Sequence, residues 1–325
     1  MQNTLLILGA GGYIGMSVVR EAVAAGWLVT ALVRTDHAAS ALLKLGAQPI
    51  IGDASNPADW LDAARRAKVL LDLVQPRLPK RLTRCAIQKA SRYRLELTQN
   101  VIDGLKALPE AQRPLLFSVS GVDDLQADGN NTISHQSGIT QTLRGFAPIG
   151  VPVRRLIEKS GVGTIHVYLG TVYGPGKGFA ERIVPGLAKH TMPIIGSGSN
   201  RLTLIHVDDA ARAMIHLAGQ LEQTQPGCNW VITDGTAPTQ ADFLNGIASL
   251  INAKPPARVP YWLAAILAGS ALVETMTRDR LNDVSALQAT GFTWRYPDWQ
   301  HGVPHMLKAL GYSVPNPLNE QEASC

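Results

Sequence analysis

Cysteine is scarce in this chain, and long apolar runs are absent. The three cysteines, Cys85, Cys228 and Cys325, stand far apart in the 325 residues. They are too few and too scattered for a disulfide framework or a zinc site, so we expect a reducing compartment, the cytoplasm, and no metal. The longest apolar stretch, Trp262 to Val273, is shorter than the roughly 20 residues that a membrane-spanning helix needs. We therefore expect no transmembrane segment.

Aromatic and charged side chains are also sparse. Aromatic residues make up 6% of the chain and the 30 bases are not gathered into a tail, so nucleic-acid bases would find little to stack on. We expect no nucleic-acid partner, although the formal net charge is +5. Charged residues make up 17%, against about 25% in a typical soluble protein. This low fraction favours an oligomer, such as a homodimer.

The hydrophobic residues, 46% of the chain, form short β-branched or leucine-rich runs that alternate with longer helical periods. This alternation is typical of βαβ units and predicts an α/β fold, a doubly wound parallel sheet of the Rossmann type. The expected strands are residues 4–8, 28–33, 48–51, 69–73, 115–119 and 164–168. The expected helices are residues 15–25, 38–45, 57–67, 86–108 and 153–159.

The pattern changes at about residue 171, where Gly- and Pro-rich loops become frequent. We interpret residues 1–170 as mainly a nucleotide-binding Rossmann domain and residues 171–312 as mainly a smaller C-terminal substrate lobe. The chain is expected to re-enter the Rossmann core near residues 203–235. Residues 313–325 are expected to form a loosely ordered tail.

A glycine-rich loop follows the first expected strand and opens the first helix. It reads Gly9-Ala10-Gly11-Gly12-Tyr13-Ile14-Gly15. Gly9 permits the tight turn, Gly12 lets the backbone approach a pyrophosphate, and Gly15 lets the helix pack on the strand. The helix N-terminus, at Tyr13 and Ile14, supplies amide donors and the positive end of a dipole. The loop therefore predicts dinucleotide binding.

The end of the second expected strand indicates which dinucleotide binds. A site that prefers NAD usually has an acid here for the ribose hydroxyls, whereas this chain has Arg34 and Thr35. The Arg34 guanidinium suits a 2′-phosphate and Thr35 can add a hydroxyl donor, which favours NADP(H) over NAD(H). The nearby Asp36 leaves open that Arg34 is a solvated surface residue. Asp53, after the third strand, could bind the adenine amino group or cap a turn.

Further motifs follow the glycine loop along nearly the whole chain, from about residue 4 to about residue 310. They are Gly52-Asp53, Ser118-Val119-Ser120, Thr171-Val172-Tyr173-Gly174-Pro175-Gly176, Ile205-His206-Val207-Asp208-Asp209-Ala210 and Gly291-Phe292. In this order the motifs resemble the extended or atypical short-chain dehydrogenase/reductase superfamily, the NAD(P)-dependent epimerase/dehydratase relatives. The resemblance implies a nucleotide site and a small-molecule substrate, but none of the motifs identifies that substrate.

The resemblance also implies a proton relay, which this chain has lost. In the family a tyrosine hydroxyl exchanges the proton while hydride moves to or from the nicotinamide, and a lysine four residues later lowers the tyrosine pKa. A serine on the preceding strand polarises the substrate oxygen. The serine aligns with Ser120, but the tyrosine aligns with Phe146 and the lysine with Gly150, and neither can take its role. An asparagine that often completes the relay aligns with Arg94.

Two prolines, Pro148 and Pro152, lie on either side of Gly150. Proline lacks the amide hydrogen and clashes inside a helix, so we expect no regular helix through both. The helix is predicted to begin only near residues 151–153, with Pro152 in its first turn.

Other side chains could replace the missing tyrosine. Tyr173, in the Thr171 to Gly176 loop, and Tyr168, on the preceding strand, are the phenols nearest in sequence to the expected nicotinamide end. Each could donate a proton, although a phenol of pKa about 10 needs a cationic neighbour to act near neutrality. Tyr173 could instead pack the loop. His135 has a suitable pKa, or it is simply a solvated loop residue.

Several charged features allow two interpretations. His206 and the two aspartates after it look like metal ligands, but the resemblance makes them a turn that leads into a helix, with Asp208 or Asp209 as its cap, and we assign no metal. Arg201 corresponds to a position that can reach an anionic substrate group in related epimerases, or it lies at the surface. The seven bases within residues 77–94 attract a phosphate-bearing ligand or form a solvated helix face.

The apolar segment from Trp262 to Val273 resembles the mobile, substrate-covering segment of relatives. It could alternatively contact a membrane surface or a second subunit.

A cofactor loop without the tyrosine–lysine relay predicts an NADP(H)-dependent oxidoreductase with a non-standard proton donor. Reduction of a C=N or conjugated C=C bond in a small, apolar metabolite fits better than alcohol or ketone chemistry. The catalytic candidates are Ser120, Tyr173 and Tyr168. The alternatives are a redox-silent NADP(H)-binding sensor or assembly factor, and a lyase or cyclase that reuses the pocket.

Overall fold

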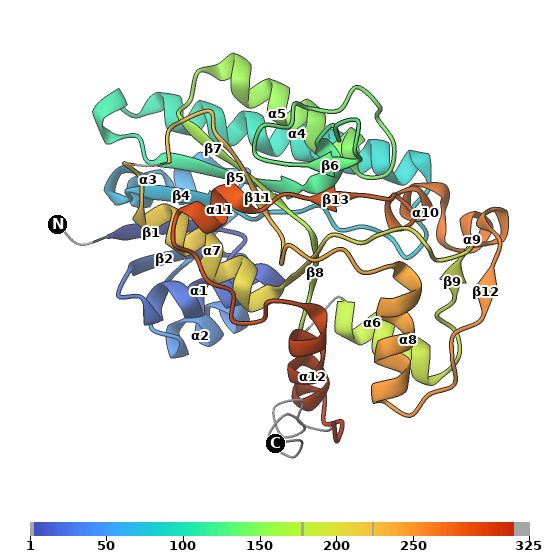
Figure 1. Ribbon diagram of the computed structural model, residues 1–325. Helices are drawn as coiled ribbons and strands as arrows, with labels where there is room; N and C mark the ends of the chain where they lie inside the picture. The colour runs from blue at the N-terminus through green and yellow to red at the C-terminus, as the bar shows by residue number, and fades with distance from the viewer. Residues whose placement is uncertain (1–2, 177–178, 223, 315–325) are drawn as a thin grey trace.

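The computed structural model describes residues 3–176, 179–222 and 224–314, arranged around one parallel sheet of seven strands (Figure 1). The strand order is β11-β7-β5-β4-β1-β2-β3. The order reverses between β1 and β4, and folds of this kind bind nucleotides in the crevice at the carboxyl ends of the strands beside such a reversal. The predicted doubly wound Rossmann fold is confirmed.

The elements of the sheet layer lie close to their predicted positions. Its strands are β1 (Thr4–Leu8), β2 (Leu28–Val33), β3 (Gln48–Ile51), β4 (Val69–Asp72), β5 (Leu115–Gly121), β7 (Thr164–Leu169) and β11 (Asn229–Ile232). Its helices are α1 (Tyr13–Ala24), α2 (Asp36–Lys44), α3 (Leu61–Arg66), α4 (Arg84–Ala107), α5 (Ala147–Ser160) and α7 (Val207–Gly219), with short 3-10 turns η1 (Pro57–Asp59), η2 (Glu110–Gln112) and η3 (Val122–Asp124). The six expected strands are confirmed, and their ends differ by at most two residues.

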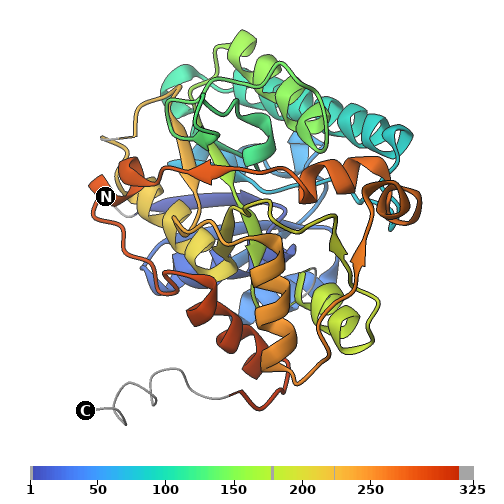
Figure 2. The same cartoon turned by 45° about the vertical axis from the view of Figure 1, so that its right-hand side comes forward.

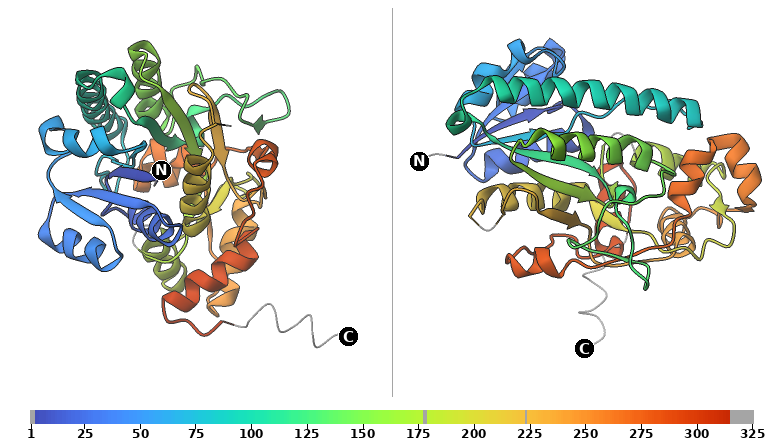
Figure 3. Two further views of the ribbon diagram at one scale, coloured as in Figure 1. Left: turned by 90° about the vertical axis from the view of Figure 1, so that its left-hand side faces the viewer. Right: turned by 90° about the horizontal axis from the view of Figure 1, so that it is seen from above.

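The strands alternate between two apolar layers, as a sheet buried on both faces requires. On β1, Leu5 and Ile7 pack into one layer with side chains of α1 and α7, whereas Leu6 and Leu8 pack into the other with side chains of α3, α4 and α5. Figure 1 and Figure 3 show these two sets of helices on opposite faces of the sheet. The sheet therefore has no solvent-facing side that could bind a ligand, and the site must lie at its edge.

Helix α5 corrects the expectation that the two prolines delay its start. The helix begins at Ala147 and runs without a break to Ser160. Pro148 lies in the first turn, where no amide hydrogen is needed. Pro152 leaves the Pro148 carbonyl without its helical donor, but the Ser91 hydroxyl of α4 donates to this carbonyl at 2.7 Å. A tertiary hydrogen bond therefore compensates for the proline inside the helix.

Most of the remaining elements form the lobe beside the sheet (Figure 2), whereas the short helix α11 (Ser285–Ala289) packs on β11 and places Leu287 in the core of the sheet layer. Short parallel pairs join β8 (Thr171–Tyr173) to β10 (Leu204–His206), β9 (Ile194–Ile195) to β12 (Arg258–Val259), and β6 (Thr132–Ile133) to β13 (Leu281–Asn282). The helices are α6 (Phe179–Ala188), α8 (Gln240–Leu250), α9 (Tyr261–Ala268), α10 (Ser270–Met276), α11 (Ser285–Ala289) and α12 (Trp299–Ala309). Side chains of α6, α8 and α12 share one apolar core.

The chain passes between the two parts more than once. After β10, α7 covers the sheet and β11 extends it, and both lie within the residues expected to re-enter the Rossmann core. Most of the expected tail, residues 315–325, lies outside the described residues. The apolar segment from residue 262 folds as α9 and α10, and Trp262 and Leu267 on α9 are 65% and 67% exposed. Among the described helices, none combines the length and the apolar character that crossing a membrane requires.

Candidate functional site

The glycine loop has the geometry of an anion cradle. Gly9 has a φ of +80°, in the left-handed region that favours glycine. A Cβ on Gly15 would lie 2.5 Å from the carbonyl oxygen of Gly9, so only glycine lets α1 start so close to β1. Gly12 is the N-cap of α1 and offers no side-chain cap. The first amide groups of the helix, beginning at Tyr13, thus lack intrahelical acceptors and are free to bind a phosphate.

Tyr13 supplies a second observation that fits a nucleotide here. Its hydroxyl is buried without a hydrogen-bond partner among the described residues, and burial raises its pKa. Gly174 and Gly176, in the loop after β8, approach Tyr13 closely: a Cβ on Gly174 would lie 3.3 Å from the Tyr13 hydroxyl oxygen, and a Cβ on Gly176 would lie 3.3 Å from the ring. An orphaned buried hydroxyl and a glycine-lined cradle fit a bound dinucleotide, which would be held by the α1 N-terminus and covered by this loop.

The residues predicted to bind the adenosine end lie at the ends of β2 and β3. Arg34 is exposed, and its charge contributes to lowering the Asp53 pKa. Thr35 is the N-cap of α2, and its hydroxyl accepts from the Ala38 amide at 3.3 Å. Asp53 accepts from both the amide and the hydroxyl of Ser55, and these hydrogen bonds lower its pKa most strongly. Thr35 and Asp53 thus also have capping roles, and their contacts with a cofactor stay predictions.

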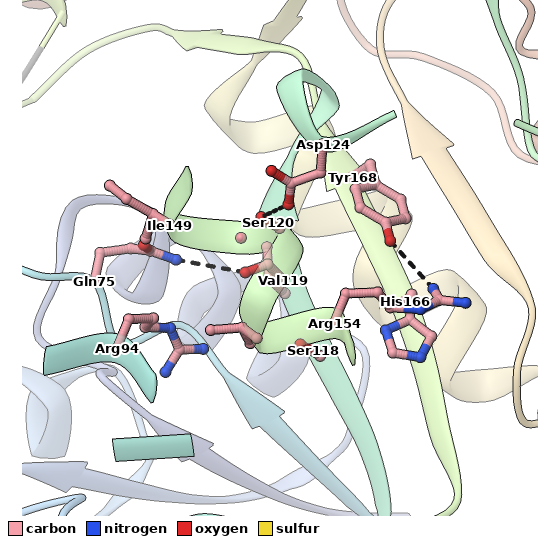
Figure 4. A pocket seen from close by; sticks show the side chains of 12 residues that line it. Gln75, Arg94, Ser118, Val119, Ser120, Asp124, Ile149, Arg154, His166 and Tyr168 are labelled. Carbon is pink, nitrogen blue, oxygen red and sulfur yellow. Dashed lines mark hydrogen bonds between the residues drawn. The ribbon is translucent and has the colours of Figure 1, made fainter. Parts of the chain in front are cut away.

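Ser120 lies at the carboxyl end of β5, directly opposite Tyr168 in the register with β7. Its hydroxyl donates to Oδ2 of Asp124 at 2.5 Å (Figure 4). Asp124 ends the η3 turn that follows β5, and its side chain is 2% exposed. Burial raises the pKa of Asp124 to about 8, against the opposing effect of the Ser120 hydrogen bond. Asp124 is therefore mainly a neutral carboxylic acid at pH 7, and it can hold and deliver a proton.

Asp124 occupies the space that a side chain at Gly150, the position predicted to align with the family's lysine, would enter. Phe146 is the N-cap of α5, and Gly150 faces the end of β5 one turn later. A Cβ built on Gly150 would overlap both the Asp124 carboxylate and the Ser120 hydroxyl. Glycine at this position is thus a consequence of the serine–aspartate pair, and no larger side chain fits without displacing that pair. Sequence reasoning missed Asp124; the available signal was an Asp-Asp pair, Asp123 and Asp124, shortly after the strand that carries Ser120.

Arg94, which aligns with the family's asparagine, has a structural partner. Its guanidinium lies 2.6 Å from Oδ2 of Asp72, and both side chains are almost fully buried. The second oxygen of Asp72 accepts from the Val74 amide at 3.1 Å. This ion pair fixes the carboxyl end of β4, and Arg94 also lines a narrow pocket together with Ser120 and Asp124 (Figure 4).

The two candidate phenols lie in different places. Tyr168 lines the narrow pocket with Ser120 and Asp124, and its hydroxyl accepts from Arg154 at 3.1 Å. Burial raises the Tyr168 pKa to about 12 in spite of Arg154, so the phenol is a weak acid. Tyr173 is fully buried in the core of the lobe, and its hydroxyl donates to the Asp298 carbonyl at 3.3 Å. This placement supports the packing role for Tyr173.

The sequence contains one Tyr-x-x-x-Lys spacing, at Tyr173 and Lys177. Gly174 and Gly176 between them have φ values of +138° and +106°, so the segment is not helical and the two residues are not neighbours on a helix face. Lys177 itself lies outside the described residues. His135, the remaining proton-donor candidate, is half-buried in the loop after β6 and does not line the cavity described next.

A cavity of about 380 Å³ connects the glycine loop to the lobe. Ile14 of α1 is part of its lining, and so are Ser120 and Asp124. Apolar side chains make up much of its wall, including Phe146 and Ile149 of the α5 region. Three arginines of the lobe complete it: Arg201, Arg278 and Arg280. The cavity thus brings together a residue of the predicted nucleotide site, the proton-holding pair and three arginines.

His206 corrects the predicted cap of α7. Its Nδ1 accepts from the Asp208 amide at 3.2 Å, so the histidine caps the helix and neither aspartate does. Ligand atoms of His206, Asp208 and His305 lie within 4.8 Å of one another, as in a metal site. However, Arg20 lies 2.5 Å from Asp208, and the two imidazoles are within hydrogen-bond distance of each other at 3.3 Å. The cluster therefore satisfies itself, and we continue to assign no metal to it.

Comparisons with known proteins agree with this geometry. Residues 9–145 match the model of an NAD(P)H-binding family, and residues 152–233 match the NAD dependent epimerase/dehydratase family. The human epimerase family protein SDR39U1, solved with NADPH, has a TM-score of 0.74 and 16% identity over 94% of this chain and 99% of its own.

Two curated proteins are similar in sequence. A 3-diazoavenalumate denitrifying reductase of a Streptomyces species is 28% identical over 317 residues, which is 92% of this chain and 98% of the relative. The photosystem II assembly factor Ycf39 of Cyanophora paradoxa is 30% identical over 118 residues, 36% of this chain and 34% of the relative.

Proposed function

The chain belongs to the extended short-chain dehydrogenase/reductase superfamily and carries an NAD(P)H-binding domain, and we propose that it is an NADP(H)-dependent reductase. In this proposal Ser120 and Asp124 replace the tyrosine–lysine relay of the family. The substrate proposed is a small, largely apolar molecule with a C=N or conjugated C=C bond. One observation carries the proposal: a buried, proton-holding carboxyl group is hydrogen-bonded to the family's serine inside a cavity that begins at the cofactor loop.

The chain's own residues supply the proton. The bound reduced cofactor would supply a hydride, which is one proton and two electrons, to the carbon of the double bond. Reduction of a neutral double bond then needs one proton on the other atom. For this step the Ser120 hydroxyl would turn from Asp124 to the substrate atom, donate its proton there and take the proton of Asp124, which becomes a carboxylate until solvent reprotonates it. An iminium substrate would need the hydride alone.

The wall of the cavity supports this reading. Phe146 and Ile149 favour an apolar substrate body, and the low polarity of this part of the wall strengthens the electrostatic effect of a positioned proton. The Streptomyces relative supports reductive chemistry, since its name describes a reductase of a diazo compound and not of a ketone. The exposed Arg34 at the end of β2 supports NADP(H), because its guanidinium is free to bind a 2′-phosphate.

A redox-silent NADP(H)-binding protein is the second candidate. The loss of the relay favours it, and the similarity of part of the chain to an assembly factor is a second observation in its favour. In that case the nucleotide would stabilise one conformation, and the serine–aspartate pair would be structural.

Cofactor oxidation separates the two candidates. We would follow NADPH absorbance with a panel of iminium, enone and ketone compounds for the wild type, Ser120→Ala, Asp124→Asn and the exposed control Asp62→Asn. The expected result is turnover of iminium or enone members and a loss of about 100-fold or more for enone turnover in the first two variants, with NADPH affinity unchanged. Wild-type activity in both variants would contradict the assigned proton path, and NADPH binding without oxidation of any member would favour the redox-silent protein.

A further inference from the structure

Arg280 is a buried cation in the cavity wall whose charge no neighbour neutralises. Its side chain is 8% exposed, and its Nη1 donates to the Val122 carbonyl, in the η3 turn that also carries Asp124. Within the described residues, no carboxylate oxygen lies within 4.0 Å of its guanidinium nitrogens, whereas Arg94, Arg201 and Arg278 each have such a partner. A buried guanidinium without a counter-charge is costly, and a bound anion removes that cost.

Neither carboxyl group near Arg280 is available to neutralise its charge. Oδ1 of Asp123 lies 3.2 Å from Arg278, and its Oδ2 accepts from the Thr275 hydroxyl at 2.6 Å. Burial raises the pKa of Asp124 to about 8, so this residue carries little charge at pH 7. Burial lowers the pKa of Arg280 to about 10, which leaves the guanidinium charged at the same pH.

The ion pair between Arg201 and Asp279 does not change the net charge of the cavity wall. Arg201 binds Asp279 through two parallel hydrogen bonds, with nitrogen–oxygen distances of 2.8 and 2.6 Å. Arg201 and Asp279 therefore neutralise each other, as Arg278 and Asp123 do. The cavity is left with one excess positive charge, and it belongs to Arg280.

We propose that Arg280 binds the carboxylate of a monoanionic substrate whose apolar body fills the cavity toward Ser120 and Asp124. This substrate class rests on the proposed reductase function, since it assumes that the same cavity holds the reacting molecule. One excess charge matches a carboxylate better than a phosphate monoester, whose charge at pH 7 is about −1.5 to −2. The guanidinium fork is also suited to bidentate carboxylate binding.

The position of Arg280 would let the bound substrate carboxylate orient the reacting double bond as well as anchor the molecule. Because the guanidinium contacts the turn that carries Asp124, an anion bound there is held at a fixed place relative to the proton-holding pair. The carboxylate would thereby orient the double bond, and Arg280 would decide which substrates are accepted. A neutral molecule of the same shape would leave the buried guanidinium without a partner.

Binding to the NADPH-loaded protein tests the proposal without any need for turnover. The probes are benzoate, trans-cinnamate, the matched neutral amides benzamide and cinnamamide, and the dianion phenyl phosphate, each titrated by calorimetry. We expect the carboxylates to bind at least about 30-fold more tightly than their amides, and phenyl phosphate to bind more weakly than benzoate. Arg280→Met should remove the preference for carboxylates, and Arg280→Lys should restore part of it.

Two controls are needed, one for the integrity of each variant and one for the loss of a positive charge. The NADPH affinity of each variant shows that its fold and nucleotide site are intact, and Arg258→Met, at an exposed arginine on β12, controls for the loss of one positive charge. Equal binding of carboxylates and amides to the wild type would overturn the proposal, and so would an undiminished carboxylate preference in Arg280→Met. Tighter binding of phenyl phosphate than of benzoate would overturn the choice of a monoanion.

The result also separates this proposal from the reductase function on which it rests. Carboxylate binding that depends on Arg280, without NADPH oxidation of any substrate, would support the anion site and contradict the reductase. Turnover of neutral substrates that is unaffected by Arg280→Met would support the reductase and overturn the anion site.

Discussion

Replacing Asp124 by asparagine tests whether a neutral carboxylic acid stands beside Ser120. Asparagine has nearly the same shape and can still accept the Ser120 hydrogen bond, but it cannot ionise. The native carboxyl has a pKa raised by burial from 3.8 to about 8. The substitution therefore removes one buried titrating group while it keeps the packing.

The sign of the effect follows from proton binding. Between pH 3.8 and about pH 8 the folded chain keeps the Asp124 proton, whereas the unfolded chain has released it. Over this range the group therefore lowers the free energy of unfolding by about 1.4 kcal/mol for each unit by which the pH rises. Below this range both states are protonated and above it both are ionised, so the contribution no longer changes. From about pH 5 to about pH 7, Asp124→Asn should gain about 2.7 kcal/mol relative to the wild type.

Urea unfolding of both proteins at constant ionic strength measures this difference. Asp234, whose pKa burial raises to about 7, is present in both proteins and cancels when they are compared. Asp62→Asn, at a side chain that is 84% exposed, provides the control for the amide substitution. A difference between Asp124→Asn and the wild type that stays within about 0.5 kcal/mol over the two pH units would refute the neutral acid, since the carboxyl would then titrate near its ordinary value.

The fold could be predicted because its signals are local. The strand β1 and the glycine loop combine a buried apolar run with residues that only one backbone path accommodates, and Gly15 shows this, since any side chain there would meet the Gly9 carbonyl. Strand alternation with helical periods then leaves few topologies besides a doubly wound sheet. In these parts of the chain, the local structure depends mainly on residues that are close together in the sequence.

The start of α5 could not be predicted in this way. The expectation treated Pro152 as a local defect, because the lost hydrogen bond is visible in the sequence. The compensating donor, Ser91, lies 57 residues away from Pro148 and meets it only because α4 and α5 pack side by side. The error therefore has a tertiary cause.

The proton-holding site was also hidden from the sequence. Ser120 could be found by its alignment, but the importance of Asp124 depends on its burial and on the missing side chain at Gly150, whose place the Asp124 carboxylate takes. Tyr173 shows the opposite error. Its place in a loop motif predicted an accessible proton donor, whereas the lobe encloses its side chain completely. Burial sets the pKa of both groups, and burial is a property of the whole fold.

Three further predictions concern the cofactor site and the lost relay. Arg34→Ala should weaken NADPH binding roughly tenfold or more and leave NADH binding unchanged, and equal affinities in the wild type would contradict the assignment of Arg34 to the 2′-phosphate. Gly12→Val should abolish nucleotide binding in calorimetry while circular dichroism shows an intact fold, because the side chain would fill the space of the pyrophosphate. Phe146→Tyr should not create alcohol dehydrogenase activity, measured as alcohol-dependent NADP⁺ reduction. The new phenol would stand at the start of a regular helix, but Gly150 supplies no ammonium group to lower its pKa, and Asp124 fills the space that a longer side chain at position 150 would enter. Efficient alcohol oxidation by this variant would mean that another cation serves the phenol, and the serine–aspartate pair would then not be a replacement for the relay.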